Sequence, residues 1–281
     1  AAIRNALLWN ATTEFNGSNS TARCEHLTID AGTTLNGNST KLTLLLTNSL
    51  VTAVTTTSGY SGASTTVLPS ATGVYQTAGA GGHYLPVGSP YRNTGTVTIN
   101  ATLATELKGL TTEAPVVLVP GQLTLPTVNL PLAVQRDTDL PDVGAHYTAI
   151  DYAVSGLYAT NGTLITIQPG VVIAGYVTGA NNWGLWIDYG AKLRAVGTAT
   201  SPVRFVWHTA VQENAASGWA GAPSAYVVRE NAFGCSPSCQ GKSALSVTTW
   251  LTSTCCWPTA MTARAACRSS SRASVSCAKI L

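Results

Sequence analysis

The chain has 281 residues, and only 10% of them are charged, against a usual share of roughly 25%. Hydrophobic residues make up 45%, which excludes an intrinsically disordered chain, because disorder requires low hydrophobicity and high net charge. No apolar run reaches the roughly 20 residues that a transmembrane helix needs, so we expect no membrane span.

The formal net charge of +3 comes from the last part of the chain. Five of the fifteen basic residues and none of the twelve acidic ones follow Glu230, so the chain up to Glu230 is slightly acidic. A nucleic-acid-binding surface would be a cluster of basic residues with aromatic side chains among them. We therefore expect no nucleic-acid partner.

A short corner pattern occurs three times, at residues 29–35, 167–173 and 187–193. In each copy an Ile ends a strand, a polar residue and a glycine form the turn, and an aliphatic residue starts the next strand. Glycine suits such a corner because it adopts a positive φ at little cost. The spacing of the last two copies, from Ile167 to Ile187, is a plausible length for one coil of a β-solenoid.

Other segments predict a mainly β structure with one helix. Residues 55–82 are rich in Thr, Ser and Gly and favour loops or irregular coils, whereas residues 101–110 favour a helix that buries Leu103 and Leu107. Several prolines in residues 124–141 indicate an extended crossing segment. Alternation then predicts two sets of side chains: inward Leu193, Ala195, Val203, Phe205 and Trp207, and outward Lys192, Arg194, Arg204 and Val206.

Three segments resemble bacterial secreted β-helix proteins of the pectin-lyase-like superfold. Residues 190–207 are similar to the motif G-A-x-L-x-A-x-G-T followed by P-V-x-F, with matches at Gly190, Ala191, Leu193, Ala195, Gly197, Thr198, Pro202, Val203 and Phe205. The second segment is Gly88-Ser89-Pro90 with Asn93 and Gly95, and the third is Asp142 to Tyr147 following Arg136 and Asp137. Asn93 stands where the family has Asp, and His146-Tyr147 replaces an aromatic–acid pair.

The resemblance implies an all-β fold, a right-handed parallel β-helix (solenoid) over residues 1–215, with irregular loops and one short helix. It also implies a secreted or cell-surface location. Residues 216–230 would connect this region to an atypical tail at 231–281, which has clustered cysteines, scattered arginines and no acidic residue. We consider two interpretations of the tail: a small cysteine-containing module, in which disulfides could form, or a segment that is out of frame or poorly ordered. A truncated fragment without independent function is a further possibility.

Three acidic residues, Asp137, Asp139 and Asp142, form the first candidate site. Carboxylates that alternate in a turn can gather oxygen ligands around calcium. A pair of carboxylates can instead act on a glycosidic bond. The third interpretation is a solvated turn, because Asp is common in turns.

A candidate glycan-binding site combines an aromatic group and a basic group. Trp183, Trp186 and Tyr189 could stack on sugar rings, although core or edge packing is the favoured interpretation. The neighbouring Asp188 is interpreted as a polar turn residue, in the same place as Asp30 and Gln168. Lys192, Arg194 and Arg204 would share an outer face on neighbouring strands and attract an acidic polysaccharide, or form a solvated face.

No catalytic motif accompanies these candidates. The four histidines are far apart in the sequence and lack ligand spacing, and there is no nucleophile elbow, P-loop or dinucleotide fingerprint. The sequence therefore predicts a non-catalytic extracellular β-helix scaffold or adhesin-like segment that contacts glycans, with calcium as the one candidate cofactor. The alternative is a polysaccharide lyase or glycoside hydrolase, which would require Asp137, Asp139 and Asp142 to lie against Lys192 or Arg204.

Overall fold

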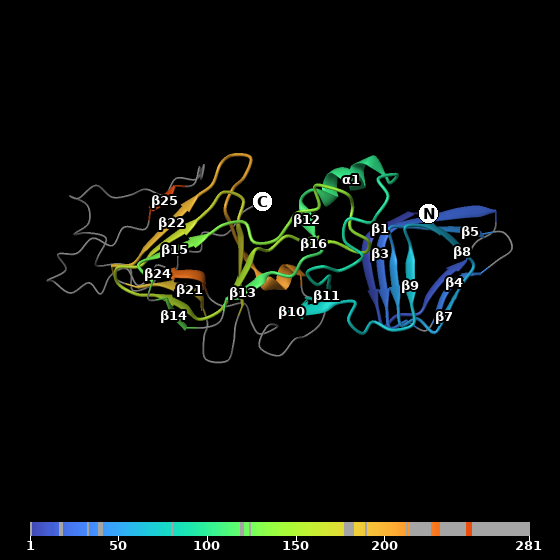
Figure 1. Cartoon of the computed structure of the whole chain (residues 1–281), viewed down its shortest axis with the longest axis horizontal. Helices are drawn as coiled ribbons and strands as arrows, with labels where there is room; N and C mark the ends of the chain where they lie inside the picture. Colours follow the sequence, from blue (N-terminus) through green and yellow to red (C-terminus); the bar gives the residue numbers. More distant parts are fainter. Residues whose placement is uncertain are drawn as a thin grey trace, which may run out of the picture.

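The computed structural model describes residues 2–16, 19–32, 34–38, 42–79, 81–118, 121–123, 125–176, 183–188, 190–211, 213, 226–230 and 246–248. The protein is mostly β, with parallel strands in five of its seven sheets and one α-helix among these residues. The parallel sheets form an N-terminal set and a C-terminal set, and shorter elements lie between them (Figure 1). No described helix has the length and apolar character needed to cross a membrane.

The N-terminal set contains one curled six-stranded sheet and one three-stranded sheet. The larger sheet has the strands β1 (Ala2–Trp9), β3 (Ser20–Asp30), β5 (Leu42–Thr47), β6 (Leu50–Thr52), β8 (Tyr60–Ala63) and β9 (Thr66–Leu68). The smaller one has β2 (Thr13–Asn16), β4 (Thr34–Asn38) and β7 (Thr56–Ser58). Ile3 pairs with Cys24 and Cys24 with Leu46, so the first strands follow one another at nearly equal steps along the sequence. The prediction of loops for residues 55–82 was wrong, because β7, β8 and β9 continue these sheets.

Residues with positive φ turn the chain at equivalent points of successive strands in this set. Two such groups occur: Asn5, His26, Asn48 and Ser64, and Asn10, Ala31 and Ala53, with φ between 44° and 54°. Asn is enriched in this conformation because its short polar side chain tolerates it. The first corner copy therefore differs from the prediction, since Ala31 and not Gly32 takes the positive φ. Gly32 is required for another reason, because a Cβ there would lie 2.7 Å from the carbonyl oxygen of Ala11.

The C-terminal set contains three parallel sheets of four strands. Their orders are β13 (Val116–Leu118), β17 (Tyr152–Val154), β20 (Val172–Gly175) and β23 (Arg204–Trp207); β14 (Gly121–Leu123), β18 (Leu157–Ala159), β21 (Trp183–Ile187) and β24 (Tyr226–Glu230); and β15 (Thr127–Leu130), β19 (Leu164–Ile167), β22 (Lys192–Val196) and β25 (Ser246–Thr248). The runs β13 to β15, β17 to β19, β20 to β22 and β23 to β25 each place one strand in each sheet. β24 and β25 lie beyond residue 215, and the rest of the tail lies outside the described residues.

The corner glycines of this set behave as predicted, with φ of 80° at Gly170 and 77° at Gly190. The prediction that one coil runs from Ile167 to Ile187 was wrong. Ile167 ends β19 and Ile187 ends β21, which belong to different sheets, so these two corners are not stacked on each other. Ile187 instead pairs with Ala159, so the stacked strand lies further back in the sequence than predicted.

The predicted alternation is largely confirmed. Leu193, Ala195 and Val203 are buried in the C-terminal core, and Phe205 packs against it. Val206 was expected to point outward to solvent, but it packs against a second apolar cluster formed with Ile150, Val172, Ala174 and Val211. The N-terminal core is a separate cluster that includes Leu27, Ile29 and Leu46.

Short elements connect the two sets of sheets. They are β10 (Gln76–Ala78) with β11 (Gly81–Tyr84), α1 (Ala101–Leu107), β12 (Leu110–Thr111) with β16 (Tyr147–Thr148), and the 3-10 helix η1 (His208–Val211). Leu103 and Leu107 are buried on α1, which confirms the predicted helix, and the side chain of Asn100 caps its N-terminus. The predicted crossing segment 124–141 is irregular only after residue 130, because Thr127–Leu130 form β15.

Candidate functional site

The three acidic residues of the first candidate site do not share one environment. Asp137 and Asp142 are buried, whereas Asp139 is exposed. Oδ2 of Asp137 lies 2.6 Å from Nε2 of His146 and accepts the backbone N–H of Asp142 at 3.1 Å. The exposed Asp139 accepts a hydrogen bond from the side chain of Gln135 at 2.9 Å. The interpretation of a solvated turn therefore fails for Asp137 and Asp142.

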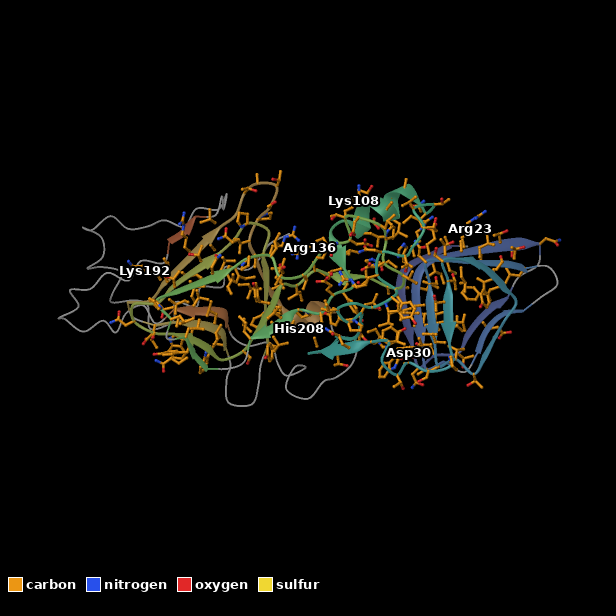
Figure 2. All side chains as sticks on the ribbon, in the orientation of Figure 1. Arg23, Asp30, Lys108, Arg136, Lys192 and His208 are labelled. Atoms are coloured by element: carbon orange, nitrogen blue, oxygen red, sulfur yellow. The ribbon has the colours of Figure 1, made fainter. Side chains whose placement is uncertain are left out.

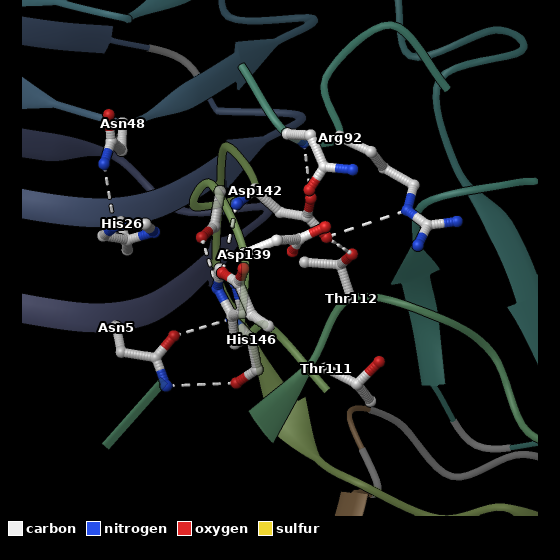
Figure 3. A network of polar contacts seen from close by, with 12 residues as sticks. Asn5, His26, Asn48, Arg92, Thr111, Thr112, Asp139, Asp142 and His146 are labelled. Atoms are coloured by element: carbon white, nitrogen blue, oxygen red, sulfur yellow. Dashed lines mark hydrogen bonds and ion pairs between the residues drawn. The ribbon is translucent and has the colours of Figure 1, made fainter. Parts of the chain in front are cut away.

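Asp142 joins residues 88–95 to residues 136–147, two of the segments on which the resemblance rests. Its carboxylate accepts the hydroxyl of Thr112 and the backbone N–H of Asn93, the latter at 2.7 Å. The guanidinium Nε of Arg92 lies 3.8 Å away. Burial raises the pKa of Asp142 above its ordinary value. These contacts, shown in Figure 3, bring residues 88–95 and 136–147 side by side.

The acidic residues show no arrangement that favours calcium. Within the part of the chain that the structure describes, no group of three or more His, Cys, Asp or Glu side chains is spaced to hold a metal ion. Asp137 and Asp142 instead accept hydrogen bonds from protein groups, which satisfies carboxylates in a buried setting. The geometry assigns them a role in holding the crossing segment.

Two asparagines of the positive-φ corner bind backbone groups of later parts of the chain to the N-terminal sheets. The amide of Asn48 accepts from the backbone N–H of Thr96 at 2.7 Å and donates to its carbonyl oxygen at 2.8 Å. Asn5 forms the same pair of bonds with the backbone of His146, at 2.6 and 3.1 Å (Figure 3). A side-chain amide carries both donor and acceptor groups, so it can replace the backbone of a missing strand.

His26 lies beside this junction and is fully buried. The Asn48 amide nitrogen lies 2.9 Å from its Nε2, and its ring contacts that of His146 edge to face at 5.1 Å. Burial, with the neighbouring His146, lowers the pKa of His26 to about 3. The sequence offered no sign that His26 and His146, which are far apart in the chain, would contact each other.

A second buried cluster centres on His83. Its Nδ1 lies 2.5 Å from Oε2 of Glu213, and its Nε2 lies 3.0 Å from Oδ2 of Asp30. Tyr147 donates its hydroxyl to Glu213, and Thr52 donates to Asp30 at 2.7 Å. Burial alone would lower the pKa of His83, but the two carboxylates outweigh it and raise that pKa. The same contacts from His83 and Tyr147, with the backbone N–H of Gly82, lower the pKa of Glu213 against the opposing effect of burial.

This cluster corrects the interpretation of Asp30 as an equivalent of Gln168 and Asp188. Asp30 is buried and contacts His83 and Thr52, whereas Gln168 is part-exposed and donates to Asn129 at 2.8 Å. Asp188 accepts the hydroxyl of Tyr158. The repeated sequence pattern identified all three corners. It did not show that a distant part of the chain would bury the first of them.

The structure describes two of the three residues of the predicted aromatic patch. Trp183 and Trp186 are half-buried on β21 and contact each other edge to face, with ring centroids 4.8 Å apart. Trp186 also contacts Tyr158 at 5.8 Å. Tyr189 lies outside the described residues. The two tryptophans thus form an aromatic cluster with Tyr158, which was not among the predicted residues.

We expected the three basic residues to share one outer face on neighbouring strands, and this was wrong. Lys192 and Arg194 are exposed on β22, which pairs with β19 and β25, whereas Arg204 is exposed on β23 in another sheet. The cause is the corner at residues 197–203, which moves the chain from one sheet to the next. None of the three forms an ion pair with a carboxylate in the described ranges.

The arrangement required by the enzyme alternative is not found among the described residues. The polar contacts of Asp137, Asp139 and Asp142 are with His146, Asn93, Thr112, Gln135 and Arg92. Lys192 lies near one end of the long axis, well away from Arg136 beside these acids (Figure 2).

Comparison of the chain with protein families, curated proteins and solved structures gave no match.

Proposed function

We propose that the chain is a segment of a parallel β-helix that serves as a non-catalytic, extracellular scaffold or adhesin-like element. The observation that carries the proposal is the order in which strands enter the three C-terminal sheets, since each run of three strands supplies one to each sheet. Parallel strands joined by crossovers are almost always right-handed, which favours the right-handed form. The resemblance of residues 190–207 to secreted β-helix proteins supports an extracellular or surface location.

The scaffold proposal is also supported by how the buried charges are used. Asp151 is fully buried and accepts hydrogen bonds from the two terminal guanidinium nitrogens of Arg136, at 2.6 and 2.7 Å. It also accepts the backbone N–H groups of Ala133, Val134 and Val172. Despite burial, the contacts with Arg136 and these N–H groups lower the pKa of Asp151. A carboxylate so fully bonded fixes the chain and is not free to act on a substrate.

The proposed contact surface is the outer face of the sheet β15–β19–β22, with an acidic glycan as its partner. Lys192 and Arg194 are exposed on β22, while Thr127 and Asn129 are exposed on β15. Side chains on one face repeat about every 6.6 Å along a strand, and neighbouring strands lie about 4.8 Å apart. The face therefore presents hydroxyl and amide groups beside two cations, which suits a linear polymer with both hydroxyls and carboxylates or sulfates.

Binding to immobilised acidic and neutral polysaccharides tests this contact. We expect the acidic polymers to be retained and the neutral ones not, with retention that weakens as salt screens the charges. Lys192→Gln with Arg194→Gln should weaken binding about threefold to tenfold, because two exposed ion pairs contribute roughly 0.2–1 kcal/mol each. Arg204→Gln, a cation on another sheet, is the matched control and should change little. Equal losses in both variants would refute the assigned face.

A cleavage assay on the same polysaccharides, with and without calcium, tests the alternative. We expect no products. Product formation that requires calcium and is lost in Asp139→Ala would replace the scaffold proposal with an enzyme.

A further inference from the structure

A pocket of about 490 Å³ lies beside the outer face of β1, where residues 145–147 meet the N-terminal sheets. Leu7 and Trp9 project from β1 on the face opposite the N-terminal core, and Ala145 to Tyr147 form another wall. Asn5, Val211 and Glu213 complete the lining. The volume is within the range of about 300–1,000 Å³ that is usual for small-molecule sites.

The pocket offers one exposed aromatic surface. Trp9 is 45% exposed, the largest side chain among the exposed hydrophobic residues that the structure describes. Its indole contacts His83 edge to face, with centroids 6.4 Å apart. Indole faces attract cations through the negative charge of the ring face, and Trp is the strongest of the aromatic residues in this respect.

The charge behind this surface is negative. Asp30 and Glu213 face His83 from two sides, so the cluster carries two carboxylates and at most one positive charge. Oε1 of Glu213 accepts Tyr147 and the backbone N–H groups of Gly82 and His83, whereas Oε2 accepts only His83 among the described residues. Since a carboxylate oxygen has two acceptor positions, the described residues leave one position of Oε2 open.

We propose that this pocket binds a small organic cation, whose ammonium group lies between Glu213 and the ring face of Trp9 while its carbon skeleton packs on Leu7 and Val211. An anion would meet the uncompensated carboxylate, and a neutral ligand would leave that charge without a partner. The chemistry fits the amine of an amino sugar and the side chain of a peptide lysine equally. The site is separate from the acidic-glycan surface proposed on β15–β19–β22, and neither proposal depends on the other.

Ligand-observed NMR and calorimetry on the full chain test the proposal with four probes. Two carry an amine, methyl glucosaminide and N-acetyl-lysine methylamide; two are neutral analogues, methyl glucoside and N-acetyl-norleucine methylamide. We expect binding of at least one amine and no binding of its neutral analogue. Preference for the glucosaminide or for the lysine derivative decides the source of the amine.

Variants connect the binding to the pocket. Trp9→Leu, at an exposed position where folding should be retained, should weaken amine binding about threefold to tenfold, since a cation–π contact contributes roughly 0.5–2 kcal/mol. Glu213→Gln should have an equal or larger effect, and Glu106→Gln, which removes an exposed carboxylate on α1, should have none. The proposal is wrong if neutral analogues bind as well as the amines, if no amine binds, or if Trp9→Leu leaves amine affinity unchanged.

Discussion

The two sets of sheets use different residues at the corners where the chain turns between strands. In the C-terminal set, three sheets enclose one apolar core, and glycines with positive φ form corners at Gly170 and Gly190. In the N-terminal set, asparagines and a histidine occupy the corner, and the asparagine side chains bind a segment far along the sequence. A corner made of glycine only turns the chain, whereas a corner made of asparagine also provides a bonding surface. The two buried histidine clusters, one with His26 and His146 and one around His83, therefore lie beside the N-terminal set.

The largest effect is expected where the C-terminal set depends on a buried charge. Asp151→Ala should lower the free energy of unfolding by about 3–5 kcal/mol, because the Arg136 charge and three backbone N–H groups lose their acceptor. Urea denaturation measures the loss, and hydrogen exchange should show it in β17 and β20 before β3. Asp139→Ala, an exposed aspartate, should change stability by less than about 0.5 kcal/mol. Similar values for the two variants would contradict the assigned role of Asp151.

Glycine substitutions at two corner asparagines separate turning from bonding. Both Asn48 and Asn10 have a φ of 49°, and glycine tolerates this conformation. Asn48→Gly should cost about 2–3 kcal/mol, because the backbone of Thr96 loses two hydrogen bonds in a part-buried site. Asn10→Gly should cost less than about 0.5 kcal/mol, since its exposed side chain has no comparable contact among the described residues. If both variants were equally stable, the corner asparagines would serve conformation alone.

The acid side of the stability profile depends on His26. Its pKa is about 3 in the folded chain, against about 6.5 when unfolded. The unfolded chain binds more protons between these values, so stability is fully present above pH 6.5 and is lost as the pH falls toward 3. The slope is at most about 1.4 kcal/mol per pH unit for one histidine.

His26→Asn, which keeps a residue that tolerates positive φ, should flatten the stability profile between pH 4 and 6.5. Part of the slope should remain, because burial also lowers the pKa of His208, to about 4. His83 acts in the opposite sense, since its raised pKa gives stability that is lost only as the pH rises above 6.5. Denaturation at a series of pH values measures these slopes, and an unchanged profile in His26→Asn would show that His26 is not the group that titrates.

The sequence predicted the C-terminal set better than the N-terminal set, for a physical reason. Alternation at Leu193 and Ala195 and the glycine at residue 190 report local geometry, which a short window of sequence contains. The strands at residues 56–68 were missed because Thr, Ser and Gly serve both loops and the polar faces of short strands. Their pairing with β4, β5 and β6 is set by distant contacts.

The candidate sites show the same division. Asp137 and Asp142 were identified as unusual, but their partners His146, Thr112 and Asn93 were not, because no local rule brings those residues together. His83 and Glu213 are far apart in the sequence, and neither lies in a motif. The resemblance noted at residues 88–95 and 136–147 marked both segments but did not predict that they would contact each other.

Cross-linking between β15 and β19 tests the parallel stacking of coils most directly. Asn129 and Thr166 are register partners on the outer face, and the spacing of about 4.8 Å between neighbouring strands falls within the range for a disulfide. Asn129→Cys with Thr166→Cys should form an intramolecular disulfide under mild oxidation, identified by peptide mass spectrometry. Asn129→Cys with Arg204→Cys, which joins two different sheets, should not. Failure of the first pair, or equal linking of both, would contradict the stacked parallel sheets on which the proposed scaffold rests.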